Sequence, residues 1–112
     1  MIEIMSRESF NVAWFIEPKQ GVIKQIKAVK IKIANRWFFY FEESEDTEQG
    51  QVTGYNITDM ETGMVAHRDL SLNYAIECVR EKVIKYPEKF EEGKEILKQH
   101  NFNFPINKIP NE

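Results

Sequence analysis

Five consecutive aromatic residues, Trp37 to Phe41, constrain the fold of this chain more than any other feature. Their side chains do not alternate with polar ones, as they would on a strand with one face in water. A strand that is apolar on both faces normally lies inside a domain, with another layer packed on each side. We therefore expect residues 37–41 to form a central strand that is covered on both faces.

The segments around this strand show the period-two alternation of apolar and polar residues that is typical of β-strands. Ile26 and Ala28 are even-numbered, whereas the apolar residues of 29–33 are odd-numbered. This change of phase predicts a β-bulge near Ala28 and Val29. Strands are expected at residues 10–16, 22–34, 37–41, 51–58 and 64–66, joined by turns at 18–21, 35–36 and 59–63 and by an acidic loop at 42–50.

The second half of the chain changes to the three- and four-residue spacing of a helix. The apolar side chains on this helical face are Leu72, Ala75, Ile76, Val79 and Val83. Ser71, or alternatively Asp69, is expected to cap the N-terminus of this helix. Pro87 is expected to end it, because proline disfavours helical backbone in the preceding residue.

A second helix is expected over 87–100, with Phe90, Ile96 and Leu97 facing inward. Gly93 should cost this helix ~1 kcal/mol relative to alanine. The elements together predict an α+β fold, in which an antiparallel meander of about five strands is followed by two C-terminal helices packed on one face. The 112 residues are expected to form a single domain, strand-rich over 8–66 and helical over 71–100, with an extended tail at 101–112.

The central aromatic strand needs a cover on the face that the helices leave open. Phe102, Phe104 and Ile106 alternate along the tail and are one candidate cover. The N-terminal segment is a second candidate, and another protein molecule is a third. Because a set of large exposed rings normally marks an interface, we expect a homodimer that forms through this aromatic sheet face.

Cysteine usage and apolar patterning bear on the compartment. With Cys78 as its single cysteine, the chain cannot form the internal disulfides of small secreted domains. Residues 1–8 lack the apolar stretch of a signal peptide, and no apolar run approaches the ~20 residues of a membrane span. We expect a cytoplasmic protein with no membrane contact. Its richness in Phe, Tyr, Met, Ile, Asn and Lys favours an AT-rich bacterial or phage genome.

The residues that could carry chemistry all have simpler explanations. His67 lies two positions before Asp69, an arrangement used in acid–base catalysis, but residues at this spacing share a strand face and pair readily by chance. Cys78 borders the apolar helical face and is expected to be a packing residue. His100 suits the C-terminal end of a helix dipole. Because metal-ligand spacings and phosphate loops are also absent from the sequence, we expect no enzymatic activity, metal or cofactor.

Charge is the strongest surface feature of the chain. Residues 42–62 contain seven acidic residues and no basic one, whereas residues 1–41 have a net charge of +4. Such a run is either a solvated loop or a contact surface for a basic partner, since clustered charge accelerates encounter with the opposite charge. We predict a non-enzymatic protein that binds another protein, such as a phage or mobile-element regulator or inhibitor. The predicted contact residues are Glu42, Glu43, Glu45, Asp46 and Glu48.

The basic residues before the aromatic run support an alternative function. Lys24, Lys30, Lys32 and Arg36 lie next to stacking rings, and this combination binds single-stranded nucleic acid. Against this reading, the net charge of the chain is −3, and no sequence signature of a known nucleic-acid-binding fold is present. Lysines also protect exposed sheet edges. Nucleic-acid binding is therefore the alternative to protein binding.

Overall fold

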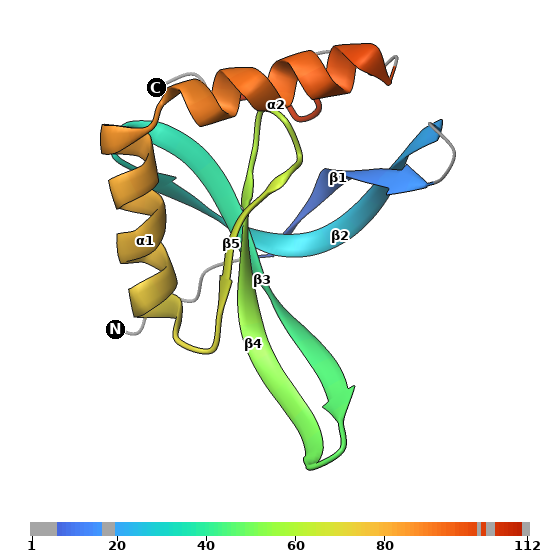
Figure 1. Cartoon of the computed structure of the whole chain (residues 1–112), viewed down its shortest axis with the longest axis vertical. Coiled ribbons are helices and arrows are strands. Elements are labelled where there is room, and N and C mark those ends of the chain that lie inside the picture. The colour runs from blue at the N-terminus through green and yellow to red at the C-terminus, as the bar shows by residue number, and fades with distance from the viewer. Residues whose placement is uncertain (1–6, 17–19, 101, 103–104, 111–112) are drawn as a thin grey trace.

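The computed structural model describes residues 7–16, 20–100, 102 and 105–110. It confirms the predicted fold class, an antiparallel sheet in the order β1-β2-β3-β4-β5 with two helices packed against it (Figure 1). The elements are β1 (Glu8–Ile16), β2 (Gln20–Ile33), β3 (Arg36–Thr47), β4 (Gly50–Asp59), β5 (Val65–Asp69), α1 (Leu72–Lys85) and α2 (Glu88–Gln99). None of the described helices is long and apolar enough to span a membrane. Residues 1–6, Pro18, Lys19 and Phe104, which entered the predictions above, lie outside the described residues.

Strand β3 is covered on both faces, as its aromatic run predicts. On one face, the fully buried Phe38 belongs to a core cluster with Ala75 and Val79 of α1. On the other face, the fully buried Phe39 stacks on Phe10 of β1, with ring centroids 4.6 Å apart. The two clusters lie on opposite sides of the sheet and together form the core.

The second face of β3 is covered by the chain itself. Phe10 of β1 and Ile109 of the C-terminal segment both pack into this cluster. Asn107 fastens the C-terminal segment to β1. Its side-chain oxygen accepts from the backbone N–H of Asn11 at 2.6 Å, and its amide donates to the carbonyls of Asn11 and Met60 at 2.9 Å each. The homodimer expectation relied on an uncovered aromatic face, and this intramolecular cover removes its premise.

The predicted bulge in β2 is wrong. The pairing with β1 ends at Ala28 and the pairing with β3 begins at Val29, and the pairs described for β2 show no register shift. Ile26 and Ala28 pack into the second cluster, whereas Ile31 and Ile33 pack into the first. Strand β2 therefore passes between the two clusters, burying one face in its first half and the opposite face in its second half. The change of apolar phase in the sequence comes from this exchange of layers.

The two helices begin and end close to the predicted residues. The hydroxyl oxygen of Ser71 caps α1 by accepting from the N–H of Tyr74 at 3.2 Å, and Pro87 separates the helices. In α2, Phe90 is buried as predicted, but the inward orientation predicted for Ile96 is wrong, because its side chain is 40% exposed. Gly93 takes the inward position, since residues three and four apart share a helical face.

Replacing Gly93 by alanine is expected to stabilise the protein by about 0.5–1 kcal/mol, because alanine removes the helix penalty of glycine. The added methyl group would lie 3.4 Å from Sδ of Met64 and 3.7 Å from Cγ2 of Thr62, within ordinary van der Waals contact. Urea unfolding measures the change. Gly63→Ala is the contrasting variant and should destabilise, because Gly63 has a φ of +67° and its Cβ would lie 2.9 Å from the nitrogen of Ala13. Destabilisation by Gly93→Ala would contradict the expectation.

Candidate functional site: an acidic hairpin arm

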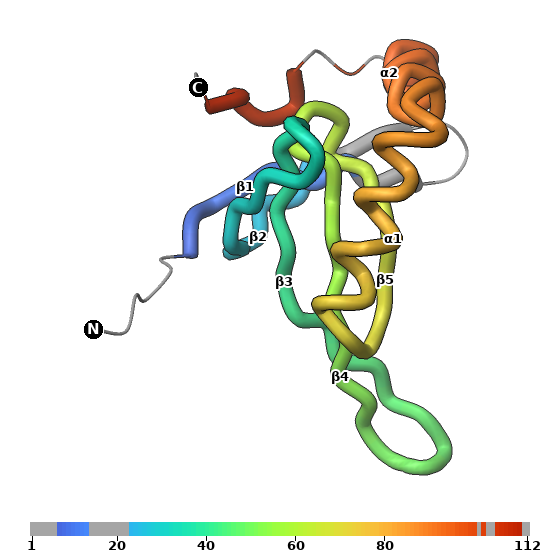
Figure 2. The backbone as a smooth tube through the Cα atoms, turned by 90° about the vertical axis from the view of Figure 1, so that its left-hand side faces the viewer, coloured from blue at the N-terminus to red at the C-terminus, as the bar shows by residue number. Residues whose placement is uncertain are grey.

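The expectation of an acidic loop at 42–50 is wrong, because most of this segment is strand. Strand β3 continues through Thr47 and β4 begins at Gly50, which leaves Glu48 and Gln49 as the tip. Residues 42–55 form a hairpin arm that projects beyond the rest of the sheet (Figures 1 and 2). The arm contains five acidic residues and no basic one.

Polar contacts hold the arm together beyond the core. The hydroxyls of Ser44 and Thr53 lie 3.0 Å apart across the two strands. At the tip, the hydroxyl of Thr47 donates to the carbonyl of Gly50 at 2.7 Å. Gly50 has a φ of 115°, a backbone conformation that glycine adopts readily and residues with a side chain rarely adopt. The arm therefore pairs as a sheet although it has no continuous apolar face.

Strand alternation divides the predicted acidic residues between the two faces of the arm. Glu43 and Glu45 belong to one face and Glu42 and Asp46 to the opposite face, while Glu48 lies at the tip. The structure thus brings Glu43 and Glu45 together and separates them from the other three.

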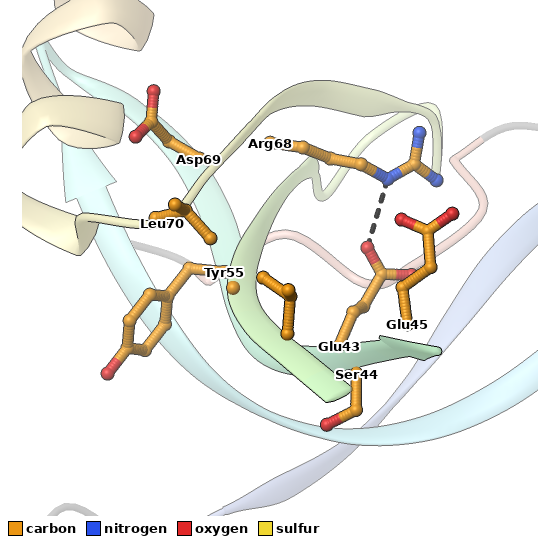
Figure 3. A pocket seen from close by; sticks show the side chains of 9 residues that line it. Glu43, Ser44, Glu45, Tyr55, Arg68, Asp69 and Leu70 are labelled. Atoms are coloured by element: carbon orange, nitrogen blue, oxygen red, sulfur yellow. Dashed lines mark hydrogen bonds and ion pairs between the residues drawn. The ribbon is translucent and has the colours of Figure 1, made fainter. Parts of the chain in front are cut away.

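A hollow of about 530 Å³ opens where the Glu43–Glu45 face meets the end of β5 (Figure 3). Leu70 and Val52 line it with apolar side chains that are 67% and 40% exposed. Gly54 allows the close approach of the chain after β5, because a Cβ at this position would lie 3.0 Å from the carbonyl oxygen of Asp69. The hollow therefore combines acidic groups and exposed apolar groups with one basic side chain, that of Arg68.

Glu43 is fixed at the base of the arm by two donors. Its Oε1 accepts from Nε of Arg68 at 2.9 Å, the contact drawn as a dashed line in Figure 3. The same oxygen accepts from Nδ2 of Asn56, also at 2.9 Å. Asn56 is buried, and its side-chain oxygen accepts in turn from the hydroxyl of Thr58 at 2.6 Å. Glu43 therefore has a structural role, whereas Glu45 is exposed beside it.

The sequence did not indicate Arg68, Leu70 or Val52 as members of this site. Strand β5 was expected to end at residue 66, but it continues to Asp69 and so places Arg68 across from the arm. In the sequence, Leu70 stands out only as an apolar residue between a strand and the cap of a helix. No periodic pattern includes it, so its exposure could not be predicted.

The basic residues of the alternative site do not form one stripe. Lys24, Lys30 and Lys32 share a face of β2, but the buried Ala28 lies between the first and the other two. Lys30 and Lys32 lie over the ring of Trp37, with their Nζ atoms 5.9 and 5.5 Å from its centroid. The two lysines and the indole therefore form one compact basic-aromatic group.

Arg36 does not belong to this group, because its guanidinium is bound to the core. Its Nε and Nη2 donate to the two carboxylate oxygens of Asp59 at 2.7 and 3.0 Å. The guanidinium also lies 4.3 Å from the centroid of the Phe90 ring. Asp59 accepts two more hydrogen bonds, from the backbone N–H and the hydroxyl of Thr62. These contacts make Arg36 a structural cation.

His67 and Asp69 do come together, with Nε2 of His67 3.4 Å from Oδ2 of Asp69. The backbone N–H of Ser71 donates to Oδ1 of Asp69 at 3.2 Å. This hydrogen bond from Ser71 is the main reason that the pKa of Asp69 is lowered, and His67 lowers it further. The pair therefore links the end of β5 to the cap of α1. Cys78 is half-buried on α1.

Within the described part of the chain, no group of three or more His, Cys, Asp or Glu side chains is arranged to hold a metal ion. No known protein family matches the chain, and comparisons with curated proteins and with solved structures find no match either. The arm and the hollow at its base are therefore the features of the structure that bear on function.

Proposed function

We propose that the protein is non-enzymatic and acts by binding another protein that presents basic residues, with the Glu43–Glu45 face of the arm and the adjoining hollow as the contact surface. The observation that carries this proposal is the meeting of Glu45 with the exposed Leu70 and Val52 in one hollow. A lysine or arginine side chain matches this combination. Its apolar stem can cover leucine and valine while its charged head stays beside a carboxylate.

The shape and charge of the arm support the same role. A narrow hairpin with five acidic residues and no basic one attracts basic surfaces and accelerates their encounter. Four of these residues, Glu42, Glu45, Asp46 and Glu48, are exposed, so they are not needed for packing. We infer that the protein is a regulator or inhibitor encoded by a phage or mobile element. It would insert the arm into a basic site of its target.

Neutralising the arm is expected to weaken partner binding at least about tenfold at low salt. The variant loses both the long-range attraction that speeds encounter and the ion pairs between the arm carboxylates and the partner. The variant replaces Glu42, Glu45 and Glu48 by glutamine and Asp46 by asparagine, and it keeps Glu43 because this residue anchors Arg68. The partner is first captured from a lysate of the source cells, and its affinity is then measured by biolayer interferometry at two salt concentrations. The difference should shrink as salt screens the charges.

The matched control makes the same charge change on the helices, with Glu77, Glu88, Glu92 and Glu95 replaced by glutamine. Its affinity for the partner should equal that of the wild type. If the arm variant also binds as the wild type does, or if both variants lose affinity equally, the arm is not the contact surface. Leu70→Ser tests the apolar part of the hollow separately and should weaken binding without a salt dependence.

The compact group of Lys30, Lys32 and Trp37 favours nucleic-acid binding as the second candidate, because it joins cations to an aromatic ring. Fluorescence anisotropy of labelled single- and double-stranded DNA and RNA at about 50 and 200 mM salt tests it. Salt-sensitive binding that is lost in Lys30→Glu and Lys32→Glu, and is strengthened in the arm variant, would place this function first.

A further inference from the structure

A second hollow, separate from the arm, lies at the corner where the two helices meet the start of β5. It has a volume of about 380 Å³, at the lower end of the range for small-molecule pockets. Its walls come from three elements, the start of β5, the end of α1 and the first half of α2. Met64 and Ala66 lie at the start of β5, Tyr86 follows α1, and Phe90 and Gly93 belong to α2.

The apolar interior of this hollow depends on Gly93. A side chain at this buried position would point toward Met64 and Thr62, because an added Cβ would lie 3.4 Å from Sδ of Met64 and 3.7 Å from Cγ2 of Thr62. Glycine is an unfavourable residue in the middle of a helix, so its presence leaves space that alanine or leucine would occupy. Phe90 is buried and supplies an aromatic wall.

The charged groups around this hollow leave an excess of positive charge. The carboxylate of Asp59 is bound by Arg36 and Thr62 and is therefore neutralised. Lys82 donates through Nζ to the carbonyl of Ala66 at 2.5 Å, so its hydrogen-bond partner is a neutral group. Lys89 lies 3.9 Å from a carboxylate oxygen of Glu92, and both side chains are largely exposed. Such an exposed pair contributes little mutual attraction, so the ammonium of Lys89 can turn to a ligand.

We propose that this hollow binds a small molecule with an apolar body and one anionic group, such as a medium-chain or aromatic carboxylate. The apolar body would lie against Met64, Phe90 and the space beside Gly93. The anionic group would lie at the rim, where Lys82 and Lys89 supply the opposite charge. This binding site is independent of the arm, and its test does not depend on the protein-binding proposal.

The proposal predicts that octanoate binds the folded protein saturably, with one molecule per chain and a Kd on the order of 0.1–1 mM. Titration followed by two-dimensional ¹H–¹⁵N NMR should show shifts that cluster at residues 64–66, 82–86 and 89–93. Octylamine has the same apolar body and the opposite charge, and it should bind at least about tenfold more weakly because both rim groups repel it. Equal binding of the two ligands, shifts scattered over other surfaces, or no saturation below about 10 mM octanoate would overturn the proposal.

Two variants separate the charge of the rim from the space inside. Lys89→Glu should weaken octanoate binding at least about tenfold, whereas Lys98→Glu, the same change farther along α2 at another exposed residue, should leave it unchanged. Gly93→Leu should abolish binding by filling the hollow. The methyl group added in Gly93→Ala makes only ordinary van der Waals contacts, so this variant should stay folded, as judged by its NMR spectrum. It should still weaken octanoate binding, because the methyl group takes up part of the hollow. An octanoate Kd that is unchanged in both Lys89→Glu and Gly93→Ala would show that the ligand lies elsewhere.

Discussion

Replacing Arg36 by methionine is expected to destabilise the protein by about 3 kcal/mol, because it leaves the carboxylate of Asp59 buried without its counter-charge. The side chain of Asp59 is only 2% exposed, and Arg36 holds both of its oxygens in a bidentate contact. The hydrogen bonds from Thr62 remain in the variant, but they supply no positive charge. The side chain of Arg36 is itself 23% exposed, which places the effect at the lower end of the range for broken buried ion pairs.

Urea unfolding of Arg36→Met measures this loss, with an unchanged m-value showing that the folded state is retained. Arg68→Met is the matched control. It breaks the ion pair with Glu43, in which the side chains are 59% and 40% exposed, and should cost less than about 1 kcal/mol. The double variant Arg36→Met/Asp59→Asn should recover part of the stability, because an amide is cheaper to bury than an unpaired carboxylate. Similar effects of Arg36→Met and Arg68→Met would contradict the assignment of Arg36 to the core.

Replacing Asn107 by alanine is expected to cost about 2–3 kcal/mol, because three backbone groups lose their hydrogen-bond partner together. These groups are the N–H and the carbonyl of Asn11 and the carbonyl of Met60. The carboxamide of Asn107 bonds to Asn11 as the backbone of a neighbouring strand would, so it closes the outer edge of β1. Its removal should also loosen Ile109, which covers the second face of β3.

Hydrogen exchange together with urea unfolding tests this expectation. The amide of Asn11 should lose protection in Asn107→Ala, and the amide of Ala13, which donates to Gly63 at 2.9 Å, should exchange faster as β1 opens. Lys108→Ala changes the exposed neighbouring residue and should alter stability by less than about 0.5 kcal/mol. An unchanged exchange rate at Asn11 would show that the C-terminal segment does not hold β1.

Much of the fold was predictable because its signals are local. The aromatic run indicated a strand covered on both faces, and Phe38 and Phe39 are indeed buried on opposite sides. Ser71 and Pro87 marked the limits of α1, because a side-chain cap and the constraint of proline act within a few residues.

The candidate site was predictable in its residues but not in its form. The run of acidic residues identified 42–48 as a candidate site. Because this segment has no apolar face, its periodicity predicts a loop and not a strand. Such a segment forms a strand only if it pairs with the backbone of a partner segment, which here is 50–55. The register of this pairing is set in the core, where β3 and β4 are buried, and continues without change to the tip of the arm. Arg68 and Leu70 joined the site because β5 is longer than expected, which places them next to the arm.

The order and type of the elements, the helix limits and the two-sided burial of β3 could all be predicted, because they follow from side-chain periodicity, caps and proline. Three other features depend on long-range packing. It assigned Arg36 to a buried ion pair instead of a basic surface, let β2 pass between two clusters without a bulge, and used Asn107 to close an edge 96 residues away in sequence. Each depends on contacts between residues far apart in the chain, which no local pattern encodes.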